Sequence, residues 1–270
     1  MGRADNGAMG GVNPMQSNDI IDNRDQKLAD HINCILGSTE AAKFAVGYFF
    51  LSGLEAVAGK LAGVSNLRIL IGNTSNRETI EQIAEGYQRL ELAAADEEGE
   101  RYLKRSEQRQ RAEETADNLR RTVERMDQTD DAQALVRSLV QMILDKLLRV
   151  RVYTKGRMHA KAYIFDYRDD GRYEKGIGIV GSSNLTLSGL THNTELNVVV
   201  HGNDNHAKLT EWFEGLWEEA QEFDDLLMQE LRQSWAGAAA TPYDIYMKTL
   251  YALVADRLDE GRARRNPLGR

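Results

Sequence analysis

The 270-residue chain has a single cysteine, three prolines and no long apolar run. Because Cys34 has no second cysteine to pair with, an internal disulfide is excluded and a reducing cytoplasm is expected. Few prolines favour long helices over a loop-rich all-β protein. No segment reaches the roughly 18–20 apolar residues of a membrane helix, and the start lacks the pattern of a signal peptide. We therefore expect a cytoplasmic protein without a membrane partner.

An excess of positive charge is also missing. The chain carries 34 Lys and Arg against 42 Asp and Glu, which gives a formal charge of −8. This balance excludes a histone-like, wholly basic nucleic-acid binder, but a local basic cleft remains compatible with it. With 41% hydrophobic residues, the chain can bury the core of one large domain, or of one domain with an appendage.

The first part of the chain alternates between helix and strand patterns. Apolar spacing predicts helices over 24–36 and 52–61, and buried strands over 42–49 and 66–72, with a further helix from about Thr79. This order is typical of α/β layer architecture.

Residues 87–149 then lack strand character, and we interpret them as an inserted helical hairpin. A narrow seam with coiled-coil-like spacing comprises Ala112, Ala116, Leu119, Val123 and Met126. The stretch 127–131 breaks the helix and offers Asp130 or Asp131 as the N-cap of the next one. Two interpretations of this hairpin stay equally open, a spacer and a contact with a partner or a second copy.

Strand character returns before a helical C-terminal region. The predicted strands are 148–154, 158–166, 176–181 and 195–202, and an Asp-Gly pair predicts a hairpin turn before the third. Aromatic residues at helical spacing in 204–222 predict a core-facing helix rather than a base-stacking platform. The expected organisation is a flexible tail (1–18), an α/β domain (19–202), helices packing on it (203–258) and a basic tail (259–270).

The predicted strand around residue 159 carries the chemistry. His159 and Lys161 are two residues apart, so a strand would point both side chains to one face. The next strand delivers Gly181-Ser182-Ser183-Asn184 at its carboxyl end, a common place for sites in α/β sheets.

These residue types suit displacement at phosphorus. A neutral imidazole can attack phosphorus or protonate a leaving oxygen near pH 7, and Lys161 supplies positive charge for the phosphate oxygens. Ser182 and Asn184 add neutral donors. A carboxylate such as Glu195 can accept the other imidazole N–H and orient the ring. No metal or cofactor is required by this set.

The arrangement His159-Ala-Lys161-x4-Asp166 followed by Gly181-Ser-x-Asn184 resembles the HKD signature of the phospholipase D superfamily. The resemblance implies a mixed β-sheet flanked by helices over about residues 20–235, with the hairpin outside it. The segment between Asp166 and Gly181 is longer than usual in the family, and a hairpin extension accounts for it.

The resemblance also implies roles for individual residues. His159 matches the nucleophile of a phosphohistidine mechanism or its partner acid, and Glu195 the carboxylate that contacts the histidine. Lys161, Ser182 and Asn184 match the residues that bind the phosphate in the family. Asp166 and Gly181 match structural positions of the motif. The chain has one HxK motif where the mechanism uses two histidines, and single-motif members pair two copies, so we expect a C2 homodimer with one composite site.

Weaker signals surround the motif. Lys155 and Arg157 are candidates for gripping flanking phosphates, and Ser183 and His192 for lining the cleft. Their alternative interpretation is ordinary surface residues. His31 and Cys34 form an HxxC pair, for which a packed core is favoured over a metal site.

The resulting expectation is a metal-independent phosphodiesterase or nuclease that acts on nucleic acid, with DNA favoured. The segments GSSNLTLSGLTHNTELNVVV and TPYDIYMKTLYAL are similar to phospholipase D-like domains that precede helicases in bacterial restriction or anti-phage systems. The alternative is a catalytically idle module that binds nucleic acid and dimerises within a helicase or nuclease assembly. Phospholipid hydrolysis ranks lower, because no basic amphipathic membrane-seeking helix is evident.

Overall fold

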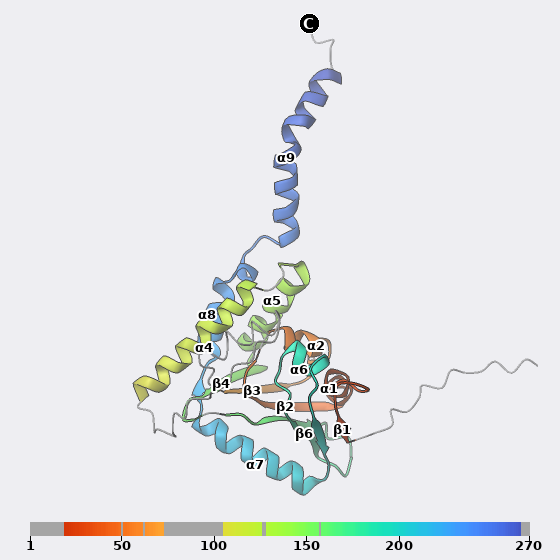
Figure 1. Ribbon diagram of the computed structural model, residues 1–270, viewed down its shortest axis with the longest axis vertical. Helices are drawn as coiled ribbons and strands as arrows, with labels where there is room; N and C mark the ends of the chain where they lie inside the picture. The colour runs from red at the N-terminus through yellow and green to blue at the C-terminus, as the bar shows by residue number, and fades with distance from the viewer. Residues whose placement is uncertain are drawn as a thin grey trace, which may run out of the picture.

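Eight strands form one mixed sheet in the order β1-β7-β6-β5-β2-β3-β4-β8 (Figure 1). The computed structural model describes residues 19–49, 51–61, 63–72, 105–125, 128–156 and 158–265. The strands are β1 (Ile20–Ile21), β2 (Thr39–Val46), β3 (Asn66–Gly72), β4 (Leu148–Tyr153), β5 (Lys161–Tyr167), β6 (Gly176–Gly181), β7 (Asn197–Val200) and β8 (Gln221–Glu222). The β2–β3 and β3–β4 pairs are parallel and all other pairs are antiparallel.

Helices cover both faces of this sheet. They are α1 (Leu28–Leu36), α2 (Leu51–Leu61), α4 (Arg105–Arg125), α5 (Asp130–Leu144), α6 (Leu187–Thr191), α7 (Asn203–Glu219), α8 (Asp224–Gln233) and α9 (Pro242–Arg265), with the 3₁₀ turn η1 (Trp235–Gly237). Most of them pack on one face around a large apolar core, whereas α7 covers the other face (Figure 1). The predicted α/β fold, a mixed sheet flanked by helices, is confirmed.

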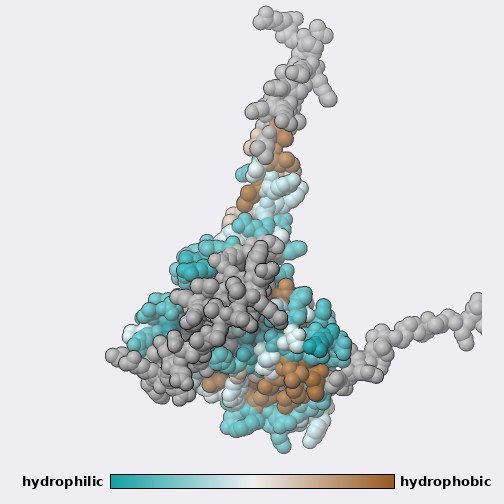
Figure 2. All heavy atoms as spheres, in the orientation of Figure 1, coloured by the Kyte–Doolittle hydropathy of each residue, from teal (hydrophilic) through white to brown (hydrophobic). Residues whose placement is uncertain are grey.

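Helix α7 buries its aromatic stripe, as its spacing predicts. Phe213 and Trp217 stack with ring centroids 5.5 Å apart and pack against Ala45, Leu70 and Ile164 of the sheet. Towards the β1 edge none of the described helices covers this face (Figure 1). There Ile20, Val198 and Val180 are cross-strand neighbours with exposed side chains, which together with Leu196 form an apolar patch, visible over the β6–β1 edge in Figure 2.

The predicted hairpin is part of the folded body. The seam residues Ala116, Leu119 and Val123 of α4 are buried in the main core, and α4 packs on α8. The second helix, α5, contributes Val136 and Leu139 to the same core. The seam therefore meets the chain's own α8. Part of 87–149, including Met126, lies outside the described residues, as does the helix expected from Thr79.

The N-cap of α5 differs from the prediction. The cap is Thr129, whose side chain accepts a hydrogen bond from the amide of Ala132 at 3.1 Å. Asp130 and Asp131, the predicted caps, instead lie in the first turn, where negative charge interacts favourably with the helix dipole.

The expected packing of the C-terminal helices holds for α7 and α8 but not for α9, which extends away from the body (Figure 1). Its apolar residues Tyr243, Ile245, Tyr246, Leu250 and Tyr251 are exposed, because the helix points away from the sheet and from the other described helices (Figure 1). The helix runs to Arg265, so the predicted tail from residue 259 begins as helix. None of the described helices is long and apolar enough to cross a membrane.

Candidate active site

The motif residues meet at the edge of the sheet where β6 ends and β5 begins. These strands are antiparallel, and Lys161 at the start of β5 pairs with Gly181 at the end of β6. Lys161 therefore lies beside the Ser182–Asn184 loop that follows Gly181. Burial lowers the pKa of the Lys161 amine, and the nearby negative charge of Glu195 acts in the opposite direction.

His159 lies just outside β5, which corrects the predicted strand of 158–166. The ladder ends at Lys161 because its partner strand β6 ends opposite it at Gly181. The preceding Met158 is buried in the α7 core, whereas His159 is exposed. Among the described residues, His159 makes no hydrogen bond, so its ring is accessible to a substrate.

The side chain of Asn184 is hydrogen-bonded to the segment that follows β2. Its side chain is only 9% exposed, and its Oδ1 accepts a hydrogen bond from the backbone amide of Tyr48 at 3.2 Å. This bond determines which end of the amide points away from β2. The Nδ2 group donates to none of the residues that the structure describes and remains available for an anionic oxygen.

Glu195 lies just before β7 and contacts Ser182. The Ser182 hydroxyl donates to Oε2 of Glu195 and accepts from the amide of Leu196 at 3.1 Å. The sequence predicts that Glu195 contacts His159, but within the described part of the chain its hydrogen bond is to Ser182. Burial raises the pKa of the Tyr163 phenol, and the negative charge of Glu195 raises it further.

Asp166, the last member of the HxKx4D motif, joins three elements. Its carboxylate accepts from Nζ of Lys43 in β2 and is 2.9 Å from Nε2 of His206 in α7. Burial by itself would raise the pKa of Asp166, but hydrogen bonds from His206 and Lys43 outweigh it and lower the pKa. Gly176 lies directly beneath, and a Cβ there would clash with the His206 ring. The geometry of Asp166 is that of a structural tie.

The remaining candidates are dispersed around this edge. Ser183 is fully buried, and its Oγ accepts from Nδ2 of Asn197 at 2.8 Å, which stabilises the loop from inside. His192 is exposed at the end of α6 and contacts Thr191. Lys155 is 3.5 Å from Glu219 of α7. Arg157 lies outside the described residues.

Several residues that shape the site carry no motif signal. The Tyr163 hydroxyl, inside the core, donates a hydrogen bond to the carbonyl of Ser183 at 2.9 Å. Only its position two residues after Lys161, on the same face of the strand, could have indicated from the sequence that Tyr163 lies near the site. Lys43 and His206 come from distant parts of the chain, and nothing local marks them. Gly47 lies against both Asn184 and Lys161.

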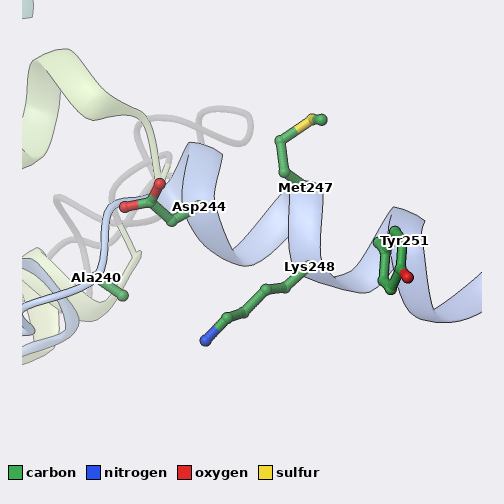
Figure 3. A pocket seen from close by; sticks show the side chains of 5 residues that line it. All are labelled: Ala240, Asp244, Met247, Lys248 and Tyr251. Atoms are coloured by element: carbon green, nitrogen blue, oxygen red, sulfur yellow. The ribbon is translucent and has the colours of Figure 1, made fainter.

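The described residues add no metal cluster to this site. No group of three or more His, Cys, Asp or Glu side chains in the described residues is arranged to hold a metal ion. His31 is buried with its Nε2 2.7 Å from Gln26, whereas Cys34 is exposed. A shallow hollow lies along α9 (Figure 3), and its lining contains none of the motif residues.

Comparison with known proteins matches this region to one family. A family model described as the phospholipase D-like domain of cardiolipin synthase matches residues 122–217. The match includes α5, so part of the hairpin that the sequence placed outside the resemblance lies inside it. No curated protein matches the chain.

Solved structures that match this chain do so at low sequence identity. The phospholipase D family member Nuc from Salmonella typhimurium is 14% identical, with a TM-score of 0.37 over 72% of this chain and 88% of that one. NucT from Helicobacter pylori is 12% identical, with a TM-score of 0.38 over 76% and 97%. Phosphatidylserine synthase from Haemophilus influenzae is 12% identical, with a TM-score of 0.44 over 88% and 45%.

Proposed function

Because the chain belongs to the phospholipase D superfamily, we propose that it is a metal-independent phosphodiesterase that cleaves nucleic acid. The observation that carries the proposal is the convergence of Lys161 and the Asn184 loop beside an exposed His159. A cation and a neutral donor there stabilise the charge that develops on the non-bridging oxygens. The imidazole is left free to attack.

The proposed reaction has two displacement steps. A nitrogen of His159 attacks phosphorus, the P–N bond forms, and the P–O bond to the leaving group breaks. The partner's His159 gives its proton to the leaving oxygen. In the second step this histidine takes a proton from water, whose oxygen attacks phosphorus and breaks the P–N bond. Both histidines return to their starting states, and no metal takes part.

The single HxK motif is the reason for proposing a dimer. One chain supplies one such histidine, whereas the two-step reaction needs a nucleophile and an acid on opposite sides of the phosphorus. A twofold axis close to His159 supplies both from identical chains. The functional unit is then a homodimer with one composite site.

A cleavage assay in EDTA tests the proposal. We expect the wild-type protein to cleave labelled DNA or RNA, and the small diester bis(p-nitrophenyl) phosphate, equally well with and without EDTA. Activity that requires a divalent metal contradicts the proposed mechanism. Analytical ultracentrifugation at micromolar concentration should show a dimer, and a strict monomer that still cleaves diesters excludes the composite site.

One observation favours the alternative, an idle nucleic-acid-binding module of a larger assembly such as a helicase or nuclease complex. Within the described residues the Glu195 carboxylate accepts a hydrogen bond from Ser182 and makes none with His159. Tight binding of nucleic acid without cleavage in any arm of the assay supports this reading. Cleavage of phosphatidylglycerol vesicles but not of nucleic acid would instead indicate a lipid substrate.

Lys155 offers a smaller, separate prediction. If it contacts a flanking phosphate, Lys155→Gln should weaken DNA binding and reduce the slope of log K against log salt by about 0.9. Lys208→Gln is the matched control, since Lys208 is also paired with a glutamate but lies on the solvent-facing side of α7. Fluorescence anisotropy at several salt concentrations measures both slopes. An unchanged slope for Lys155→Gln excludes the contact.

A further inference from the structure

Gly47, just after β2, lies beside the side chains of Asn184 and Lys161. A Cβ placed on it would be 3.1 Å from Oδ1 of Asn184 and 3.8 Å from Cε of Lys161. It would also be 3.5 Å from the carbonyl oxygen of Met158, the residue before His159. The segments of Asn184, of Lys161 and of Met158 therefore all pack close to the Cα atom of Gly47.

Gly72, the last residue of β3, packs against the same two segments of backbone. A Cβ on it would be 2.6 Å from the carbonyl oxygen of Gly47 and 2.8 Å from that of Met158. Neither glycine has a positive φ, so neither is needed for a left-handed backbone. What requires glycine here is close approach, and the backbone after β2 lies against the segment that leads into His159.

We infer that Gly47 is a positioning residue that sets the orientation of the Asn184 amide beside Lys161. This inference rests on the proposed function, because it concerns how the same site holds its phosphate. Tyr48, the next residue, donates its amide proton to Oδ1 of Asn184. Gly47 thus provides the space and Tyr48 the hydrogen bond that fix one orientation of the Asn184 amide.

We expect an alanine at position 47 to leave the fold intact but to displace the side chain of Asn184. A carbon–oxygen contact of 3.1 Å is closer than ordinary packing allows, so the Asn184 side chain must move by a few tenths of an ångström. That shift lengthens the bond from the Tyr48 amide, already 3.2 Å long, and redirects Nδ2. Catalysis is sensitive to displacements of this order when reacting groups are held in fixed geometry.

The test compares Gly47→Ala with Gly59→Ala, whose added Cβ meets nothing within 4 Å on α2. We expect Gly47→Ala to lower kcat by about tenfold with a smaller change in KM, while Gly59→Ala keeps the wild-type rate. In an Asn184→Ala background, the same Gly47→Ala change should cost less than about twofold, because the side chain it displaces is gone. Equal costs in both backgrounds, or a Gly47→Ala rate within about twofold of wild type, overturn the inference.

A readout that needs no substrate separates this inference from the proposed function. Hydrogen exchange of the Tyr48 amide should accelerate in Gly47→Ala and in Asn184→Ala, but not in Gly59→Ala. If the wild-type protein cleaves nothing and Tyr48 still responds in this way, the proposed function fails while the positioning role stands. An unchanged Tyr48 amide in Gly47→Ala removes the positioning role whatever the activity.

Discussion

Replacing His159 by alanine is expected to lower the rate of phosphodiester cleavage by roughly 10⁴-fold, since removal of the nucleophile leaves only binding and charge stabilisation. His159→Asn should be equally inactive, because an amide cannot form the P–N bond. Both variants should remain folded, because His159 is exposed and bonded to none of the described residues. The measurement is single-turnover cleavage of labelled DNA in EDTA, with circular dichroism to confirm folding.

His201→Ala is the matched control. His201 is also exposed, and its Nε2 is 3.0 Å from Asp19 at the far end of β7. It should cleave at the wild-type rate. A His159→Ala protein that keeps more than about a tenth of wild-type activity would exclude His159 as the nucleophile.

Mixed dimers test whether the site is shared. Random pairing of equal amounts of wild-type and His159→Ala chains gives wild-type pairs in about a quarter of the dimers. A composite site that needs both histidines then retains about a quarter of the activity of the same total amount of wild-type protein. Independent sites retain about half. The wild-type chains must be refolded together with the variant, so that the subunits exchange completely.

The central strands and the motif could be predicted from local patterns. The strands over 66–72 and 176–181 are observed with the predicted bounds, because apolar runs flanked by turn residues suit buried strands. The proximity of Lys161 to Gly181 follows from joining two such strands by a hairpin. Pattern was less reliable at strand ends, and His159 and Glu195 both lie just outside the strands that were predicted to contain them.

Contacts between distant segments could not be predicted in this way. The place of Gly47 beneath Asn184 depends on β2 lying next to β5 in the sheet, and a single glycine after a strand carries no sign of that neighbour. The same holds for His206, which reaches Asp166 only because α7 crosses the sheet. For α9 the packing prediction was wrong, because its apolar residues, among them Tyr243, Tyr246 and Leu250, are exposed on a helix that extends away from the body (Figure 1).

The tie at Asp166 leads to the second large effect. Asp166→Ala should lower the free energy of unfolding by about 3 kcal/mol, because it leaves the Lys43 ammonium, only 6% exposed, without its carboxylate. Asp170→Ala, which breaks an exposed pair with Arg172, should change stability by less than about 0.5 kcal/mol. Urea unfolding at pH 7 measures both. Equal effects of the two variants would show that the tie contributes nothing particular to stability.

The pH dependence gives this prediction a sign. Hydrogen bonds from His206 and Lys43 overcome the effect of burial, so the pKa of Asp166 in the folded protein lies below its unfolded value of about 3.9. The unfolded chain therefore binds this proton more readily, and the contribution of the carboxylate is complete above that value. It is lost as pH falls through the folded pKa. The stability difference between wild type and Asp166→Asn should shrink as the pH falls below about pH 4.

Folded Asp166→Asn should still cleave at pH 7 within a few-fold of the wild-type rate, because the carboxylate points to Lys43 and His206. Unfolding curves at several pH values and cleavage at low temperature, where the variant stays folded, make the two measurements. A stability difference that grows towards low pH would contradict the lowered pKa. A loss of activity as large as that of His159→Ala would mean that Asp166 takes part in the chemistry rather than in holding α7 to the sheet.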